Sequence, residues 1–417
     1  MKILVLGSGI VGVTAAHFLA RDGHEVHVID RQALAANETS FSNAGMIAPG
    51  HAYPWSSPRA PKILWRSLFR GDTSLKLKPS LDPYMWMWCL KFLAQCTAEK
   101  AAANARNKVR LCAYSQESLQ FLLDETPIDY HRVTGGAVYL YRDPALYEAG
   151  VKATKILTDN GVVLQPKTVD EAARIEPALE SVKSQLAGVI YSPRDESGDC
   201  HLFANKLAQH CTEKRGVTFH WSTAIERIEA SGDRVERVVT SKGAMTADAY
   251  VLATGSYAPI HARSIGISLP IYPVKGYAVT VPVDGRNRAP RLSGVDEQNL
   301  VAWSRLGDRL RLTATAEISG YGTDHKPGDF AHMLKTAQGL FPDGADFARP
   351  SYWAGLRPMT PEGTPILGPA RYRNLWLNTG QGHMGWTMSF GSARIVADMI
   401  AGRKPAIDLT GLTYANA

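Results

Sequence analysis

Three glycines near the start of the chain have the spacing of a phosphate-binding turn. Gly7, Gly9 and Gly12 follow the pattern G-x-G-x-x-G, and Asp30 ends the next apolar segment. Gly7 permits a tight turn, Gly9 lets the backbone approach a pyrophosphate, and Gly12 allows close packing of the following helix. Asp30 is placed to accept hydrogen bonds from a ribose diol. The pattern therefore predicts dinucleotide binding.

The elements around these residues are those that the turn requires. A short apolar strand over residues 2–6 precedes the glycines, a helix over 13–21 follows them, and a second strand covers 25–29. The helix would direct its free N–H groups and positive dipole end at the phosphates. The residues alone leave NAD, NADP and FAD open. Asp30 favours a ribose without a 2′-phosphate, although the adjacent Arg31 weakens that argument.

A second glycine turn lies near the C-terminus. Residues 379–385 contain Gly380, Gly382 and Gly385, and a helix over about 385–400 follows them. The N-terminus of that helix would stabilise the negative charge that builds on a flavin ring as it is reduced. This second turn favours FAD over a nicotinamide cofactor.

Composition and charge exclude several classes of protein. The net charge of +7 comes from scattered lysines and arginines, and no zinc finger, RNA-binding signature or basic arm occurs, so nucleic acid is not an expected partner. The start of the chain has no signal-peptide pattern, and no apolar run approaches the ~20 residues of a membrane span, so we expect a cytoplasmic protein. The five cysteines have no C-x-x-C or zinc spacing, which predicts reduced thiols and no metal site.

Strand and helix signals follow an order that interleaves two domains. Dinucleotide-type elements occur at both ends and in the middle, and extended alternating segments within 272–318 indicate an antiparallel sheet. We predict an α/β fold in which a Rossmann-like domain is interleaved with an α+β substrate domain built on a mixed or antiparallel sheet. The predicted bounds are 1–85, 145–180, 200–270 and 350–417 for the Rossmann-like domain, and 86–144, 181–199 and 271–349 for the substrate domain.

Long segments of the chain resemble the FAD-dependent D-amino acid oxidase superfamily. They are residues 6–13, 28–31, 42–45 with 49–50, 85–88, 195–200, 272–277, 355–365, 374–380 and 385–388. Within the superfamily the chain is most similar to the bacterial D-amino acid dehydrogenases of the quinone-linked small-subunit type. The resemblance implies a D-amino acid oxidase-like fold that binds FAD non-covalently. It also implies oxidation of D-amino acids to imino acids, which hydrolyse to 2-oxo acids and ammonia.

Several functions stay open on the sequence alone. The first is a dehydrogenase for D-amino acids that passes electrons to a membrane quinone or another carrier, with D-proline or hydroxy-D-proline as a competing substrate class. The second is an oxygen-using D-amino acid oxidase or glycine/sarcosine-type oxidase. A nicotinamide-dependent oxidoreductase and a non-catalytic flavoprotein subunit are the others.

The resemblance and the two glycine turns together predict the residues that hold FAD. They are Gly7, Gly9, Ile10, Val11, Gly12, Asp30, Arg31, Ser42, Asn43, Gly45, Met46, Ala224, Gly255, Gly380, Gly382, Met384, Gly385 and Thr387.

Substrate binding needs a group that orients a carboxylate, and a guanidinium does this best because its fork matches two oxygens. Arg357 is the first candidate for that role, and Arg305 is a weaker one. Tyr277 would hydrogen-bond the substrate, or else would be a core tyrosine. His51 and Tyr53 follow the flavin loop and are candidate specificity positions. Two further residues, Lys275 and His383, are candidates for a place beside the flavin.

Tryptophans stand beside lysine and arginine in the segments 62–70 and 85–93. Such segments suit a membrane interface, where a quinone is within reach. They also suit two amphipathic helices that pack in the core, which is the more common use of an aromatic stripe. We favour the core packing and keep peripheral membrane contact as the alternative.

Overall fold

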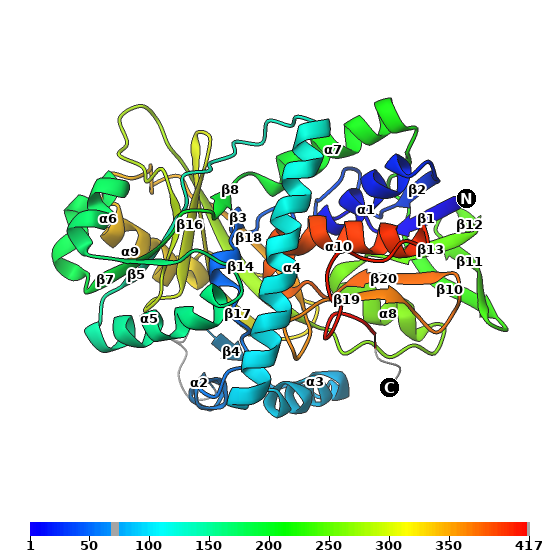
Figure 1. Ribbon diagram of the computed structural model, residues 1–417, viewed down its shortest axis with the longest axis horizontal. Coiled ribbons are helices and arrows are strands. Elements are labelled where there is room, and N and C mark those ends of the chain that lie inside the picture. The colour runs from blue at the N-terminus through cyan, green and yellow to red at the C-terminus, as the bar shows by residue number, and fades with distance from the viewer. Residues whose placement is uncertain (68–74, 415–417) are drawn as a thin grey trace.

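Two sheets of different character lie side by side along the long axis of the molecule (Figure 1). A computed structural model describes residues 1–67 and 75–414 of the chain. One sheet has six strands and is mostly parallel, and the other has nine strands and is mixed. The long helix α4 (Ala98–Glu125) runs across the molecule where the two sheets meet. The predicted α/β fold with two interleaved sheets is confirmed.

The parallel sheet contains the glycine fingerprint. Its strand β1 (Lys2–Leu6) pairs in parallel with β2 (Glu25–Ile29) and with β13 (Ala249–Leu252). Strands β1 and β13 are almost continuously buried, as expected for parallel strands that are covered on both faces. The remaining strands are β9 (Thr218–His220), β20 (Leu375–Thr379) and the antiparallel edge strand β19 (Ile366–Pro369).

Two helices of the parallel sheet begin at the predicted glycine turns. Helix α1 (Ile10–Arg21) starts inside the fingerprint, directly after Gly9, and α10 (Gly385–Ile400) starts at the last glycine of the second turn. Both pack against each other and bury apolar side chains in one core with α4 and α7 (Cys200–Arg215). The two helix N-termini therefore point from one layer towards the same end of the sheet.

The mixed sheet is built on the antiparallel strands that the sequence indicated. Strand β14 (Tyr272–Pro282) pairs with β17 (Arg309–Ile318) on one side and with β18 (Ser351–Met359) on the other. The other strands are β16 (Val301–Leu306), β15 (Ser293–Asp296), β5 (Ala137–Tyr141), β7 (Gly188–Ser192), β6 (Gln165–Lys167) and β4 (Leu75–Leu77). Helices α6 (Val169–Ile175) and α9 (Ala331–Leu340) pack under this sheet.

Smaller elements connect the two sheets. A hairpin is formed by β10 (Ile225–Ser231) and β11 (Arg234–Thr240), and β12 (Gly243–Met245) extends it. The others are β3 (Met46–Ile47), β8 (Glu196–Ser197), α2 (Ala60–Ser67), α3 (Pro83–Ala94), α5 (Pro144–Thr158), α8 (Ala258–Arg263) and the short helices η1 (Pro49–His51), η2 (Pro177–Gln185), η3 (Gly255–Tyr257), η4 (Pro327–Phe330) and η5 (Gly382–Met384).

The strand pairing and helix packing differ from the predicted domain bounds at four places. Residues 75–77, 165–167 and 351–359 form strands of the mixed sheet, although 1–85, 145–180 and 350–417 were assigned to the Rossmann-like domain. Helix α4 packs on α10, although 86–144 was assigned to the substrate domain. The predicted bounds are wrong for these segments because a helix or a short strand carries no local signal of which sheet it will pack against.

The aromatic segments form helices with two apolar faces. In α3 one face buries Met85, Trp88 and Phe92 in a core cluster, as the preferred prediction required. The opposite face leaves Trp86, Met87, Leu90 and Leu93 exposed. Residues 68–70 of the first aromatic segment lie outside the described residues. Within residues 1–67 and 75–414, no helix combines the length and apolar character that crossing a bilayer requires.

The cysteines have the state that their spacing predicted. All five are unpaired and buried. Among the described residues, no cluster of three or more His, Cys, Asp or Glu side chains could hold a metal ion.

Candidate active site

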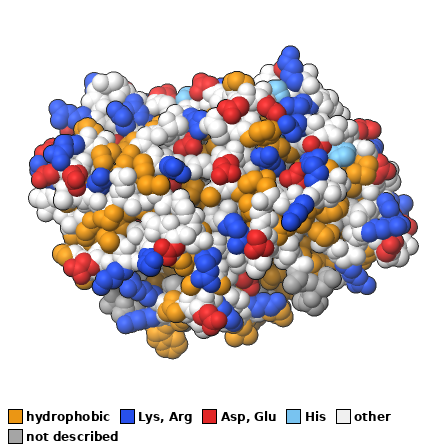
Figure 2. All heavy atoms as spheres, in the orientation of Figure 1, with side chains coloured by type: hydrophobic (Ala, Val, Ile, Leu, Met, Phe, Trp, Pro, Cys, Tyr) orange, Lys and Arg blue, Asp and Glu red, His pale blue; other side chains and the backbone are white. Residues whose placement is uncertain are grey.

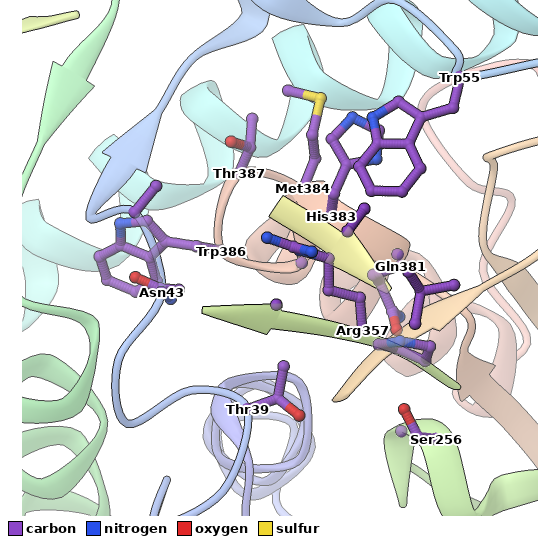
Figure 3. Close-up of a pocket in the computed structure, with 18 of the residues that line it drawn as sticks. Thr39, Asn43, Trp55, Ser256, Arg357, Gln381, His383, Met384, Trp386 and Thr387 are labelled. Carbon is purple, nitrogen blue, oxygen red and sulfur yellow. The ribbon is translucent and has the colours of Figure 1, made fainter. Parts of the chain in front are cut away.

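One large cavity is lined by residues from both sheets. It has a volume of about 1430 Å³ and extends from the glycine fingerprint to strands β14 and β18 and the start of α10. Figure 3 shows the part of its lining around Arg357, His383 and Thr387. Pockets for single small ligands usually measure roughly 300–1,000 Å³. The cavity is therefore large enough for a dinucleotide together with a small substrate.

The fingerprint turn has the geometry that its glycines predicted. Gly7 has a φ of +103°, which side-chain-bearing residues rarely adopt. A Cβ on Gly12 would overlap the Gly7 carbonyl oxygen, so α1 can pack this closely only because residue 12 has no side chain. A Cβ on Gly9 would meet nothing nearer than the Ser40 Oγ atom at 3.6 Å. The turn thus leaves room on its cavity side for a phosphate.

Asp30 lines the cavity and also fixes the fingerprint turn. Its Oδ2 atom accepts hydrogen bonds from the Ser8 N–H and hydroxyl, both at 2.7 Å, and its Oδ1 atom accepts one from the Gln32 N–H at 2.8 Å. Burial raises the pKa of this carboxyl above its usual value. A carboxylate offers about four acceptor positions. Oδ1 therefore keeps capacity for a ribose hydroxyl.

Arg31 is already paired. Its Nε atom lies 2.5 Å from a Glu38 carboxylate oxygen, and its guanidinium lies 4.0 Å from the centre of the Tyr257 ring. Because Glu38 neutralises this charge, Arg31 is not an open partner for a 2′-phosphate. Arg31 therefore no longer weakens the argument from Asp30 for a ribose without a 2′-phosphate.

Most of the predicted FAD residues line the cavity. They are Gly7, Gly9, Ile10, Val11, Asp30, Arg31, Ser42, Asn43, Met46, Ala224, Gly255, Gly382, Met384, Gly385 and Thr387. Three predicted glycines do not line it, and each has another reason to be glycine. Gly12 allows α1 to pack closely on the turn. Gly45 and Gly380 have φ values of +71° and +80°, a backbone conformation that residues with side chains rarely adopt.

The second glycine turn brings α10 to the far end of the cavity. The Thr387 hydroxyl accepts a hydrogen bond from the Ala48 N–H at 3.2 Å, which ties the loop after β3 to this helix. Gly385, Trp386 and Thr387, at the start of this helix, line the cavity, so the positive end of the helix dipole lies at this wall. Negative charge on a flavin ring would be stabilised there. This end of the cavity therefore suits a flavin.

Arg357 carries an unpaired charge into the same end of the cavity. It lies on β18, diagonal to Gly276 on β14, and a Cβ on Gly276 would overlap its guanidinium. Its Nη1 atom donates to the Thr315 carbonyl oxygen at 3.1 Å. No carboxylate forms an ion pair with it among the described residues, and burial lowers its pKa to about 10. An anionic ligand would supply the missing partner.

A buried lysine fixes His383 at the cavity wall. The Lys108 Nζ atom lies 3.1 Å from His383 Nε2 and donates to the Tyr53 carbonyl oxygen at 3.0 Å. The His383 ring stacks on Trp55 with centroids 4.8 Å apart, and Figure 3 shows these two rings side by side above Arg357. Burial, with Lys108 and Arg357 nearby, holds the pKa of His383 well below its ordinary value. His383 is therefore a neutral wall of the cavity.

His51 and Tyr53 both line the cavity, as predicted. His51 Nε2 lies 2.9 Å from an oxygen of Glu297, a cavity residue that follows β15. The His51 ring also stacks on Tyr139, whose hydroxyl donates to Asp195 at 2.5 Å. Burial raises the pKa of Asp195 to about 6, and the Gly50 N–H donates to the same carboxylate.

Three other candidates occupy different places. The Tyr277 ring lines the cavity, but its hydroxyl donates to Glu317 at 2.9 Å inside the core, which is the core-tyrosine alternative. Lys275 pairs with the same carboxylate at 3.0 Å and does not line the cavity. Arg305 donates to the Gly307 carbonyl at the tight turn after β16 and also lies outside the cavity lining. Arg357 is thus the candidate arginine that reaches the cavity.

Sequence reasoning missed several cavity residues. Thr39, Ser40, Trp55, Ser256, Tyr257, Glu297, Gln381 and Trp386 line the cavity, and Lys108 acts just behind it. Gln381 and Trp386 lie within or beside the second glycine turn, so a wider window around that turn would have found them. Lys108 and Glu297 carry no local signal, because their partners are distant in the sequence.

Comparisons with known proteins agree with this geometry. A family model described as FAD dependent oxidoreductase (DAO) matches residues 2–399. The chain is 45% identical to D-amino acid dehydrogenase 2 of Mesorhizobium japonicum, over 99% of this chain and 100% of the relative. It is 47% identical to the D-amino acid dehydrogenase of Paramagnetospirillum magneticum, over 99% and 98% of the two chains.

Solved structures share the fold. The glycine oxidase of Geobacillus kaustophilus superposes with a TM-score of 0.77 at 21% identity, covering 100% of this chain and 99% of the other. L-Proline dehydrogenase of P. horikoshii superposes with a TM-score of 0.74 at 19% identity, covering 97% and 94%. The family match and the full-length relatives show that the chain belongs to the DAO family of FAD-dependent oxidoreductases.

Proposed function

We propose that the protein is a D-amino acid dehydrogenase that oxidises its substrate at Cα. The observation that carries this proposal is Arg357, a guanidinium at the wall of the cofactor cavity with no carboxylate partner among the described residues. The full-length relatives named D-amino acid dehydrogenase support the same substrate class. The substrate carboxylate would be the missing partner of Arg357.

The fingerprint and the second glycine turn would hold FAD from its two ends. Gly7 and Gly9 with the N-terminus of α1 would receive the pyrophosphate, and Asp30 would receive the adenosine ribose. The start of α10, with Gly385 and Thr387 at the cavity wall, would receive the flavin ring. When bound, FAD accepts the hydride that leaves the substrate Cα.

The protein's own contribution is orientation. Arg357 would hold the carboxylate with two parallel hydrogen bonds, which fixes where the Cα–H bond points. Gly276 gives the guanidinium the space to lie flat against β14. Trp55 and His383 close one side of the cavity with a stacked, neutral surface. Together they would exclude water around the reacting atoms.

The electron acceptor belongs to the same proposal. We propose that a membrane quinone is reached through peripheral contact of α2 and α3 with an anionic bilayer. Helix α3 exposes Met87 and Leu90, and Leu81 is exposed just before it; Figure 2 shows hydrophobic side chains beside lysine and arginine at the lower edge of the molecule, where these helices lie. One apolar part of the cavity is lined by residues of α2, α3 and α4, among them Ala60, Leu64, Trp88, Phe92 and Ala101. It would connect that face to the flavin.

An anaerobic titration tests the proposed function. The yellow holoenzyme is mixed with D-alanine, other D-amino acids, D-proline, glycine, the L-enantiomers and NADH, and the flavin absorbance is followed. We expect bleaching by D-substrates and none by L-enantiomers. A colourless protein, or a flavin that only NADH reduces, would contradict the proposal. Bleaching by D-proline alone would instead assign the imino-acid class.

Two acceptors separate a dehydrogenase from an oxidase. The reduced enzyme is exposed either to air, with peroxide measured, or to a soluble quinone analogue. We expect fast reoxidation by the quinone and little peroxide. Rapid peroxide formation with no response to quinone would reassign the enzyme as an oxidase.

Replacing Arg357 tests its role. Arg357→Ala removes a charged hydrogen-bonding group worth about 1.5–3 kcal/mol, so KM should rise roughly 10- to 100-fold while FAD stays bound. Arg357→Lys should recover part of the loss, because a single ammonium keeps the charge but not the fork. Unchanged KM in Arg357→Ala would refute the carboxylate role.

A further inference from the structure

The proposed reaction requires a neutral amine, yet an amino acid in water carries an ammonium group. A proton must therefore leave the substrate nitrogen before hydride transfer, and a base at the cavity wall would accept it. The titratable side chains that line this part of the cavity include His51, Tyr53, Tyr277, Glu297 and His383, and Lys108 lies behind them. The hydrogen bonds of each group indicate whether it can accept a proton.

Four of these groups are unsuited to accept a proton. The His383 Nε2 atom faces the Lys108 ammonium, and neighbouring cations and burial keep His383 neutral. The Lys108 Nζ atom points at Tyr53 O and His383 rather than into the cavity. The Tyr277 hydroxyl is bonded to Glu317. Burial, reinforced by Glu297, raises the pKa of Tyr53 far above its usual value, so its hydroxyl stays protonated.

His51 has the arrangement of an activated base. Because a carboxylate only accepts, the proton of the neutral imidazole sits on Nε2 and is donated to Glu297 at 2.9 Å. This leaves Nδ1 as the unprotonated nitrogen, and it has no hydrogen-bond partner among the described residues. The side chain is 34% exposed and lines the cavity. The same carboxylate would stabilise the imidazolium once a proton arrives.

The surroundings hold this ring in place. It stacks on Tyr139 with centroids 5.1 Å apart and meets Tyr53 edge-on at 5.9 Å. Tyr139 is itself fixed by Asp195, which also accepts a hydrogen bond from the Gly50 N–H, the residue before His51. The charged groups that act on His51 are Glu297, Asp195 and Lys108. Burial alone would lower the pKa of His51, but the Glu297 carboxylate outweighs it and raises that pKa.

We propose that His51 is a catalytic residue that accepts the ammonium proton of the bound substrate through Nδ1, with Glu297 as its positioning residue. One N–H bond of the ammonium breaks, an Nδ1–H bond forms, and the electron pair stays on the substrate nitrogen. No electrons are transferred in this step. The inference rests on the proposed D-amino acid dehydrogenase function and adds the proton acceptor to it.

The test is the pH dependence of flavin reduction in wild-type holoenzyme and in His51→Asn, Glu297→Gln and the control His332→Gln, which changes an exposed histidine on α9. In His51→Asn, the rate near neutral pH should fall about 100-fold or more. It should approach the wild-type rate at alkaline pH, where the substrate amine is already neutral. Glu297→Gln should move the rise to lower pH and reduce the rate less, and the control should match wild type.

A second measurement does not depend on turnover. Histidine NMR of the holoenzyme should show the His51 pKa falling in Glu297→Gln, because the stabilising carboxylate is gone. If wild type fails to reduce its flavin with any D-substrate, the proposed function is wrong. If wild type is active but the pH profile of His51→Asn parallels it, or if alkaline pH does not restore the rate, the proton-acceptor role is refuted.

Discussion

At the scale of single residues, the cavity depends on the missing side chains of glycines as much as on the side chains that line it. Gly12 lets α1 approach the fingerprint turn, and Gly276 lets the Arg357 guanidinium lie against β14. In both places a single Cβ would occupy the space that a functional group needs. Arg357 also has only backbone carbonyl oxygens as hydrogen-bond acceptors among the described residues, so its charge stays available to a ligand.

Gly276→Ala tests this spacing without removing the arginine. The new Cβ would push only the end of a flexible side chain, so the fold should survive while the guanidinium is displaced. We expect KM for the D-amino acid to rise roughly tenfold, which corresponds to about 1.4 kcal/mol, with little change in Tm. Gly285→Ala is the matched control, because nothing lies within 4 Å of its Cβ position. Equal KM values for the two variants would contradict the spacing argument.

The buried Lys108 should make the free energy of unfolding depend on pH. Burial lowers its pKa to about 7, whereas an unfolded lysine titrates near 10.4. Between these values the unfolded state binds more protons, so stability contributed by this residue rises with pH by up to ~1.4 kcal/mol per unit. The Tm of Lys108→Met relative to wild type should therefore fall as pH increases from 7 to 10. Lys155→Met, at an exposed lysine, should show no such trend, and parallel curves for Lys108→Met would refute the shift.

At the scale of elements, the contact between α4 and α10 connects the fold to the cofactor site. Gly391 of α10 lies against Ser115 of α4, and a Cβ at residue 391 would come within 2.9 Å of the Ser115 backbone. Helix α10 carries Gly385 and Thr387 at its start, where they line the cavity. A shift of α10 would therefore move the groups proposed to receive the flavin.

Gly391→Ala should destabilise the protein even though alanine favours helix. Overpacking a close helix contact costs about 1–3 kcal/mol, which outweighs a propensity gain of ~1 kcal/mol or less. We expect a lower Tm and weaker retention of FAD on dilution. Gly339→Ala, in α9 with open space around it, should raise stability slightly. A Tm at or above wild type in Gly391→Ala would show that the two helices separate without cost.

The sequence could predict elements whose signal is local. The fingerprint, the hairpin at 225–241 and the antiparallel strands within 272–318 each follow from spacing, alternation or turn residues in one window. The role of α4 could not be predicted in this way, because its sequence shows an amphipathic helix but not the sheet that it covers. Lys108 and Glu297 were missed for the same reason. Their partners, His383 and His51, lie 275 and 246 residues away in the chain.

At the scale of the whole molecule, the cavity lies where segments from both sheets meet. The fingerprint is at residues 7–12, Arg357 is the residue proposed to bind the substrate carboxylate, and the second glycine turn is at 380–385. Because the chain passes repeatedly between the sheets, each sheet contributes to one cavity. The interleaved order was visible in the sequence, whereas the bounds required the strand pairing.

At the scale of the whole molecule, we also expect the protein to bind the surface of an anionic bilayer. The protein has a net charge of +7. Helices α2 and α3 expose Lys62, Leu90 and Lys91, and Leu81 is exposed just before α3. Apolar side chains next to lysines suit the surface of an anionic bilayer, where charge attracts the protein and the leucines insert. We expect the holoenzyme to sediment with phosphatidylglycerol-containing vesicles, and less so as salt is raised.

The double variant Leu81→Asp/Leu90→Asp tests whether these helices make the contact. Burying a leucine is worth about 1.5–3 kcal/mol, so losing two should lower vesicle affinity roughly 100-fold or more. Turnover with a water-soluble quinone analogue should stay near wild type, since neither side chain lines the cavity, while turnover with a long-chain quinone in vesicles should fall. Leu146→Asp, at an exposed leucine on α5, should bind vesicles as wild type does. Equal sedimentation of all three proteins would place the membrane contact elsewhere or exclude it.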